Sequence, residues 1–331
     1  MKKSILLVNL LLVSIAAIAQ DTIPDFKRAA TEKIRAEFPR ARILNFEYNQ
    51  SFARDFDSEI FGDAFQEGQI QSQRSFNAAI NLPFYRNKKL VVTASANYDF
   101  NEFKFDGLEN VSLTSPFEQN GTVDFHNFST ALSATYFSKL FKKPVIYNTS
   151  IIADGNDKGF QRLKGLIGAS LIIKKTERTT MTLGVIVFVD RTAQIPFFPT
   201  FTYNHQFKNS EWEFDFILPS RVLLRRPLGS NGRISLGTTF GGTGFYANVD
   251  SPNLPDVFEY SQLEINTGLI YEHRISYNMV ATVKGGMTSF LSNRLTEKGE
   301  PNKDFIYKNN QEATGYFNLG FSFNPFANKN P

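Results

Sequence analysis

The sequence predicts an all-β protein, a transmembrane antiparallel up-and-down β-barrel of about 14 strands, within a range of roughly 12 to 16. Three observations predict it. Apolar and polar residues alternate with a period of two along most of the chain. No run of 18 or more apolar residues is present that would form a membrane-spanning helix. The composition is rich in aromatic residues, with 34 Phe and 12 Tyr, as expected where apolar strand positions face lipid.

The first 19 residues predict a cleaved secretory signal peptide. Lys2 and Lys3 precede an apolar stretch over residues 5–15, and a small-x-small site at Ala17 and Ala19 precedes Gln20. An uncleaved N-terminal anchor is the alternative. The chain has no Cys, so neither a disulfide nor a lipid anchor on cysteine contributes to stability or location.

Residues 20–41 are expected to form a periplasmic segment with a short helix over residues 25–39. Apolar residues recur there every fourth position, and Pro24 and Pro39 mark the ends. The sequence leaves open whether this helix plugs the pore mouth or is a short lead-in to the barrel. The helical residues that recur are Phe26, Ala30, Ile34 and Phe38.

From residue 42 the period changes from that of a helix to that of a strand. In residues 90–103, for example, Leu90 and Val92 lie on one parity and Thr93 and Ser95 on the other, which gives an apolar and a polar face. The barrel is expected over residues 42–326, followed by a tail at 327–331. The alternation predicts strands around residues 44–48, 76–84, 90–103, 127–136, 145–153, 163–173, 181–189, 197–207, 212–218, 221–228, 233–246, 261–271, 279–289 and 316–326.

Two of these strands need a turn between them. Leu218, Pro219 and Ser220 predict a tight turn that separates 212–218 from 221–228, because proline is poorly tolerated inside a sheet. The connections also alternate in kind. Short, basic turns such as 86–89 and 142–144 alternate with the longer predicted loops 53–68, 106–124, 248–259 and 293–312, of which the first three are acidic. Short periplasmic turns and long external loops are typical of outer-membrane barrels.

A soluble β-sandwich is the alternative that alternation alone leaves open. In a sandwich the polar faces meet bulk water, and long charged side chains dominate them. Here the polar parity of the strands is rich in Asn, Ser, Thr and Gly, with few charges. That composition favours a confined, hydrated interior with lipid outside.

At this level the chain resembles the outer-membrane β-barrel families of Gram-negative bacteria, particularly uncharacterised porin-like barrels of unknown function. The processing site around Gln20, the repeated hairpins, residues 212–228 (WEFDFILPSRVLLRRPL) and the closing residues 316–326 (YFNLGFSFNPF) carry the resemblance. It implies an outer-membrane location, surrounding lipid and recognition of the last strand by barrel-assembly machinery. The tail 327–331 departs from strands that end the chain. The resemblance implies no reaction.

The sequence gives no sign of an enzyme or of a cofactor. The three histidines, His126, His205 and His273, are far apart and have no metal-ligand spacing. A lipid-acting enzyme is the least supported reading, because His126 and Ser129 would point to opposite faces of one strand. The net charge of +4 includes two lysines of the signal and no compact basic run, which excludes a nucleic-acid partner.

The informative feature is the set of charged residues on the inward parity. Glu213 and Arg225 are expected to face each other across the 218–221 turn, and Glu264 to lie near Lys284. Opposed charges across a pore would select small polar solutes by a transverse field, whereas the alternative is an ion-pair network that fills a non-conducting scaffold or partner-binding barrel. The candidate pore-lining residues are Glu47, Asp99, Lys164, Glu213, Asp215, Arg221, Arg225, Arg233, Glu264 and Lys284.

Overall fold

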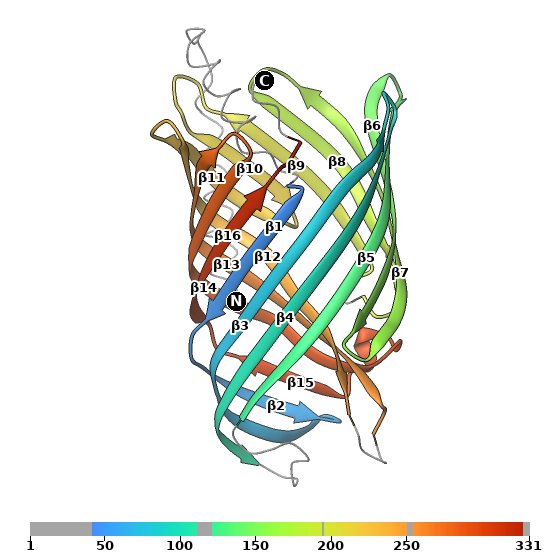
Figure 1. The fold of residues 1–331 in the computed structure, drawn as a ribbon, viewed down its shortest axis with the longest axis vertical. Helices are drawn as coiled ribbons and strands as arrows, with labels where there is room; N and C mark the ends of the chain where they lie inside the picture. The colour runs from blue at the N-terminus through green and yellow to red at the C-terminus, as the bar shows by residue number, and fades with distance from the viewer. Residues whose placement is uncertain (1–41, 111–120, 194, 250–253, 327–331) are drawn as a thin grey trace, which may run out of the picture.

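A computed structural model describes residues 42–110, 121–193, 195–249 and 254–326 of the chain. They form one antiparallel sheet that closes on itself (Figure 1). The elements are β1 (Leu44–Ser51), β2 (Arg54–Ile60), β3 (Asp63–Arg86), β4 (Leu90–Asn110), β5 (Gly121–Leu140), β6 (Lys143–Asn156), β7 (Gly159–Lys175), β8 (Thr179–Val189), β9 (Phe197–Gln206), β10 (Glu213–Leu218), β11 (Arg221–Leu228), β12 (Gly232–Asn248), β13 (Val257–Ser276), β14 (Met279–Glu297), the 3₁₀ turn η1 (Asn302–Asp304), β15 (Tyr307–Gln311) and β16 (Thr314–Phe323).

The first and last strands close the barrel. β1 pairs with β16 from Leu44 opposite Phe323 to Ser51 opposite Tyr316, and β2 continues the first strand by pairing with β15. Because β1 and β2 are two parts of one wall strand, and β15 and β16 two parts of another, the sixteen segments make fourteen strands. The predicted fold class is therefore confirmed.

The barrel has its apolar side chains outside and its polar side chains inside. Leu132, Ile151, Ile167 and Leu183, on four successive strands, are 52–58% exposed. Many of the most buried side chains are polar, among them Asn101, Gln262, Asn293, Asn318 and Thr288. A water-soluble protein has the opposite distribution, so this surface fits surrounding hydrocarbon.

The strands reach further than the sequence predicted at the end away from the termini. The predicted loop 53–68 is wrong, since β2 and the start of β3 occupy it and only Phe61 and Gly62 form the turn. The predicted loop 293–312 is likewise shortened, by the end of β14 and by β15. Strand alternation there is masked by acidic residues, which the sequence reading assigned to loops. The predicted signal peptide, the helix 25–39 and the tail 327–331 lie outside the described residues.

The two ends of the barrel differ. The start of β1 and the end of β16 lie at one end, here called the terminal end, together with the short turns at 87–89 and 141–142. The opposite end, with β2 and β15 at the bottom of Figure 1, is the loop end. The wall has unequal height, because β3 to β5 have 20 to 24 residues whereas β10 and β11 have 6 and 8. Across the described ranges, no helix is long and apolar enough to cross a membrane.

Glycines allow β13 and β14 to approach closely, which leads to a test of the fold. A Cβ at Gly286 would lie 2.0 Å from the carbonyl oxygen of Thr267, whereas a Cβ at its neighbour Gly285 would meet nothing closer than 3.7 Å. We expect Gly286→Ala to destabilise the barrel by about 1–3 kcal/mol, as overpacking does. The measurement is the temperature at which the folded band disappears on unboiled gels, with Gly285→Ala as the matched control. Equal temperatures for both variants would contradict the close approach.

Candidate functional site

The interior of the barrel is the candidate site, and all ten predicted residues lie on its inner face. The inward row can be followed from strand to strand by register, for example from Glu47 to Asn77 to Asp99. A separate inward row runs through Glu213, Arg225 and Ser235 on β10 to β12. Whether these residues line a conducting pore remains a prediction, but the structure divides them into separate groups.

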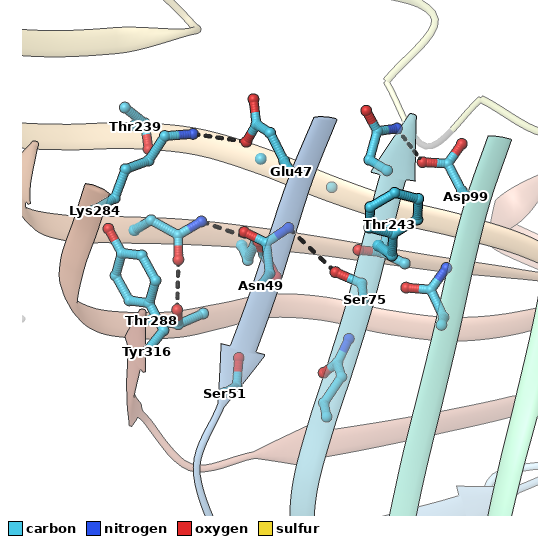
Figure 2. A pocket seen from close by; sticks show the side chains of 18 of the residues that line it. Glu47, Asn49, Ser51, Ser75, Asp99, Thr239, Thr243, Lys284, Thr288 and Tyr316 are labelled. Carbon is cyan, nitrogen blue, oxygen red and sulfur yellow. Dashed lines mark hydrogen bonds and ion pairs between the residues drawn. The ribbon is translucent and has the colours of Figure 1, made fainter. Parts of the chain in front are cut away.

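Four of the ten lie around one polar cavity of about 480 Å³. Glu47, Asp99, Glu264 and Lys284 are joined there by neutral polar side chains and by Tyr316 (Figure 2). The volume is in the range of small-molecule sites. The neutral polar residues that line it are Asn49, Ser51, Gln73, Ser75, Asn77, Asn97, Asn101, Thr239, Thr243, Asn266 and Thr288.

Lys284 is paired with Glu47 and not with Glu264. Its Nζ donates to Glu47 Oε2 at 2.9 Å, and Asn318, on the strand between them, donates to the same oxygen at 3.0 Å. The predicted Glu264–Lys284 opposition is wrong, because β13 and β14 are offset so that Lys284 stands opposite Ile270 and Glu264 opposite Phe290. The Glu264 carboxylate instead accepts bonds from Gln262 and Asn266, at 2.8 and 2.9 Å.

The amide side chains hold the remaining carboxylate of the cavity. Asp99 accepts hydrogen bonds from Asn77 and Asn97, and Asn49 donates to Ser75 at 3.2 Å. Such amides offer donors and acceptors in equal measure. Most of the cavity lining is therefore neutral and polar, and among its charged groups carboxylates outnumber ammonium groups by three to one.

Four of the ten form a second group, on the β10–β11 hairpin. Glu213 stands opposite Arg225, which confirms that predicted pair. Asp215 is fully buried and pairs with Arg225 and with Arg221, the latter at 2.8 Å. These ion pairs join β10 to β11 on the inner face of the wall and so stabilise the hairpin.

Arg233 forms a third group at the terminal end. Its Nε donates to Glu272 Oε2 at 2.7 Å, and Arg42 pairs with the other carboxylate oxygen of Glu272 at 2.5 Å. The sequence analysis missed Glu272, although it lies on the inward parity of its strand.

Lys164 belongs to a fourth group, here called the loop-end cluster: Asp154, Arg162, Lys164, Asp190 and Glu259. Lys164 Nζ lies 2.9 Å from Asp154 and 2.8 Å from Glu259. Arg162 pairs with Asp190 and, at 2.7 Å, with Glu259. This cluster ties β13 to β6, β7 and the connection after β8. Sequence reasoning missed its other four members, because they come from segments up to 105 residues apart.

Asp190 lies just beyond the end of β8, outside the strands. Partial burial by itself would raise the pKa of this carboxyl, but the Thr192 N–H, Lys164 and Arg162 outweigh burial and hold the pKa below its ordinary value. A carboxyl with a lowered pKa stabilises the fold above its unfolded-state pKa, and the stabilisation is lost only as the pH falls through the lowered value. The Asp190 contribution to the cluster therefore persists in mildly acidic conditions.

An aromatic cluster lies between the cavity and the loop end. The rings of Phe125 and Phe245 stack with centroids 4.0 Å apart, and Phe245 stacks on Tyr260 at 4.6 Å. Phe103 contacts all three rings. The loop-end half of β12 thus lies against β5 and β6 across the interior. Tyr246, next along β12, donates to Asp154 at 2.9 Å.

The described residues contain no group of three or more His, Asp or Glu side chains placed to hold a metal ion. Their inward carboxylates are bonded to arginine, lysine or amide groups, as given above. The arrangement supports binding or passage of a polar molecule.

Of the comparisons with known proteins, the one with solved structures finds matches. No protein-family model matches the chain, and no curated protein sequence matches it. Among solved structures, an outer-membrane channel of Pseudomonas putida F1 has 10% identity and a TM-score of 0.39, covering 86% of this chain and 96% of that one. Omp33, an outer-membrane protein of Acinetobacter baumannii, has 8% identity and a TM-score of 0.32, covering 85% and 98%. These similarities concern the barrel and carry no function to this chain.

The buried hairpin group gives a test of the interior. Replacing Asp215 by Ala removes the buried carboxylate that pairs with Arg225, whose side chain is also buried. Breaking a buried pair in this way costs about 3–5 kcal/mol. We expect Asp215→Ala to lower the midpoint of urea unfolding in lipid vesicles strongly. Glu211→Ala is the control, because Glu211 and Arg226 form an exposed pair at 3.2 Å that contributes about 1 kcal/mol at most. A midpoint unchanged by Asp215→Ala would contradict the buried charge group.

Proposed function

We propose that the protein is an outer-membrane channel of porin type, through which small polar solutes pass, with cations and neutral solutes preferred over anions. One observation carries the proposal: a polar cavity lies inside a barrel whose outer surface is apolar. Lipid outside and hydrogen-bonding groups inside are what a route for polar solutes through a bilayer requires.

The charge of the cavity supports the preference for cations. Three carboxylates and one ammonium line it, and Lys284 is already bonded to one of the carboxylates. In the low dielectric of a membrane such an excess of negative charge attracts cations and repels anions more strongly than it would in water. The many amide and hydroxyl groups offer neutral solutes replacement hydrogen bonds for those lost to water.

We infer that the terminal end faces the periplasm and the loop end the exterior. Short turns at the terminal end and the even number of strands support this orientation, which places both chain ends of the barrel on the side of export. Barrel-assembly machinery and outer-membrane lipid are then the expected partners, after removal of the signal peptide before Gln20.

The orientation can be tested because the chain has no Cys. Phe61, at the loop end, and Phe141, at the terminal end, are 69% and 85% exposed. We expect a membrane-impermeant maleimide to label Phe61→Cys in intact cells, and to label Phe141→Cys only after the outer membrane is permeabilised. The reverse labelling pattern would invert the orientation, and labelling of neither variant in intact cells would contradict exposure at the outer surface.

Passage is tested by planar-bilayer conductance of the refolded chain that starts at Gln20. Under a salt gradient we expect steady openings with a cation-selective reversal potential. Lys284→Ala should increase the cation permeability ratio roughly two-fold or more, since it removes the only ammonium group of the cavity. Glu264→Gln should lower the ratio. Lys158→Ala is the control, because it removes the same charge from an exposed turn residue that does not line the cavity.

A second candidate is a non-conducting barrel that serves as a scaffold or binds a partner. The aromatic cluster and the loop-end cluster favour it, because both fill the interior between the cavity and the loop end. A folded, inserted barrel that shows no openings under any salt gradient would support this candidate and overturn the channel.

A further inference from the structure

The wall of the barrel is interrupted beside the β10–β11 hairpin. Pairing between β11 and β12 ends with Arg221 opposite Thr239, and one more backbone bond joins Phe240 N to Ser220 O at 2.8 Å. Beyond it, none of the described strands pairs with residues 241–248 of β12 on this side. Across the hairpin, β10 pairs with β9 only from Phe201 to Gln206. Residues 197–200 of β9 therefore also lack a strand on that side among the described residues.

This interruption, here called the wall gap, lies between residues 197–200 of β9 and 241–248 of β12, on the loop-end side of the hairpin turn. Two strands are missing from the wall there, so three strand spacings, about 14 Å, separate its edges at the level of the turn. The edge of β12 adds little bulk. Gly242 and Gly244 are exposed, and a Cβ at Gly244 would meet only the Tyr260 carbonyl oxygen, at 3.4 Å.

The gap opens at a level where the outer surface is apolar. Phe197, on the β9 edge of the gap, is 57% exposed, and Leu218 and Val222, on the hairpin that borders the gap, are 43% and 41% exposed. On the neighbouring strand β8, Val187 and Val189 are exposed as well. Such a surface adjoins the hydrocarbon of the bilayer, so hydrocarbon is what borders the opening.

On the β9 side of the gap the inner face carries apolar side chains, whereas on the β12 side residues 241–244 line the polar cavity. Ile186 stands opposite Phe198 on the inward row, and the rings of Phe188 and Phe198 meet edge to face at 6.0 Å. Ile217, beside the hairpin turn, lies on the same inner face, opposite Thr202 and Arg221. A passage for polar solutes does not require these four apolar side chains, here called the inner apolar patch.

We propose that the wall gap is a side entrance, through which the alkyl chain of a membrane amphiphile leaves the bilayer and reaches the inner apolar patch. The two observations are independent: strand pairing leaves the wall open, and β8, β9 and β10 beside the gap carry four apolar side chains on the inner face. An alkyl chain bound there removes the apolar side chains from contact with water, and this hydrophobic burial drives binding. The proposal does not rest on conductance and holds for a channel or for a closed barrel.

Quenching of tryptophan by brominated lipid tests the entrance directly. Trp212 is the single Trp, so Trp212→Phe gives a background without tryptophan fluorescence. In it, Phe198→Trp reports on the inner apolar patch and Phe197→Trp on the lipid-facing surface. Ile270→Trp reports on an interior position in a complete wall, since Ile270 pairs with Ser235 on one side and Lys284 on the other.

In vesicles of phosphatidylcholine with brominated acyl chains, we expect Phe198→Trp to lose at least half as much fluorescence as Phe197→Trp, and Ile270→Trp to lose little. Quenching of Phe198→Trp no greater than that of Ile270→Trp would overturn the proposal. If Phe198→Trp does not fold, Phe188→Trp replaces it.

A lengthened hairpin tests whether the gap is the route. Inserting eight residues at Pro219–Ser220, as two alternating Val/Thr strand extensions joined by Asn-Gly, would fill the missing part of the wall. We expect this extension to abolish the quenching of Phe198→Trp while leaving that of Phe197→Trp unchanged. The same insertion at Asp157–Lys158, on the β6–β7 turn, is the control. Quenching of Phe198→Trp that survives the extension would overturn the wall gap as the entrance.

Discussion

Backbone hydrogen bonding between the first and last strands is the constraint on which the rest of the structure depends. In hydrocarbon, a strand edge without partners would leave several polar groups unsatisfied, each at a cost of about several kcal/mol. The pairing of β1 and β2 with β16 and β15 removes the edge between the two ends of the sheet. The edges at the wall gap, by contrast, have no strand partner among the described residues. Closure also brings Glu47 on β1 to Lys284 on β14, with Asn318 of β16 between them. The cavity therefore exists only because the two ends of the chain meet.

Closure does not make the interior uniform. The closing strands and the strands beside them carry the polar cavity, whereas β8 and β9 carry the inward apolar side chains Ile186, Phe188 and Phe198. Between these regions the loop-end half of β12 lies across the interior against β5 and β6. Its aromatic and charged contacts, with Phe125 and Asp154, compensate for the partners that β12 lacks on its free side. The low part of the wall and the crossing of β12 are thus two aspects of one arrangement.

The charged residues inside the barrel have different physical roles. Asp215 and Arg225 are buried, and with Arg221 they fix the hairpin. The loop-end cluster joins segments from both halves of the chain. The four charged groups of the cavity line its open volume. An inward charge is therefore evidence of a pore only where the structure leaves space beside it.

The sequence by itself determined the period-two alternation, and with it the number of strands, the face on which each residue lies and the local pair of Glu213 and Arg225. Facing is a property of each strand, and a hairpin pair depends only on the adjacent turn. Only the tertiary structure decided that Lys284 meets Glu47, that Arg162 meets Glu259, and that the wall is low beside β12. These features depend on register between strands distant in the chain and on how the closed sheet bends, and neither is written in a local pattern.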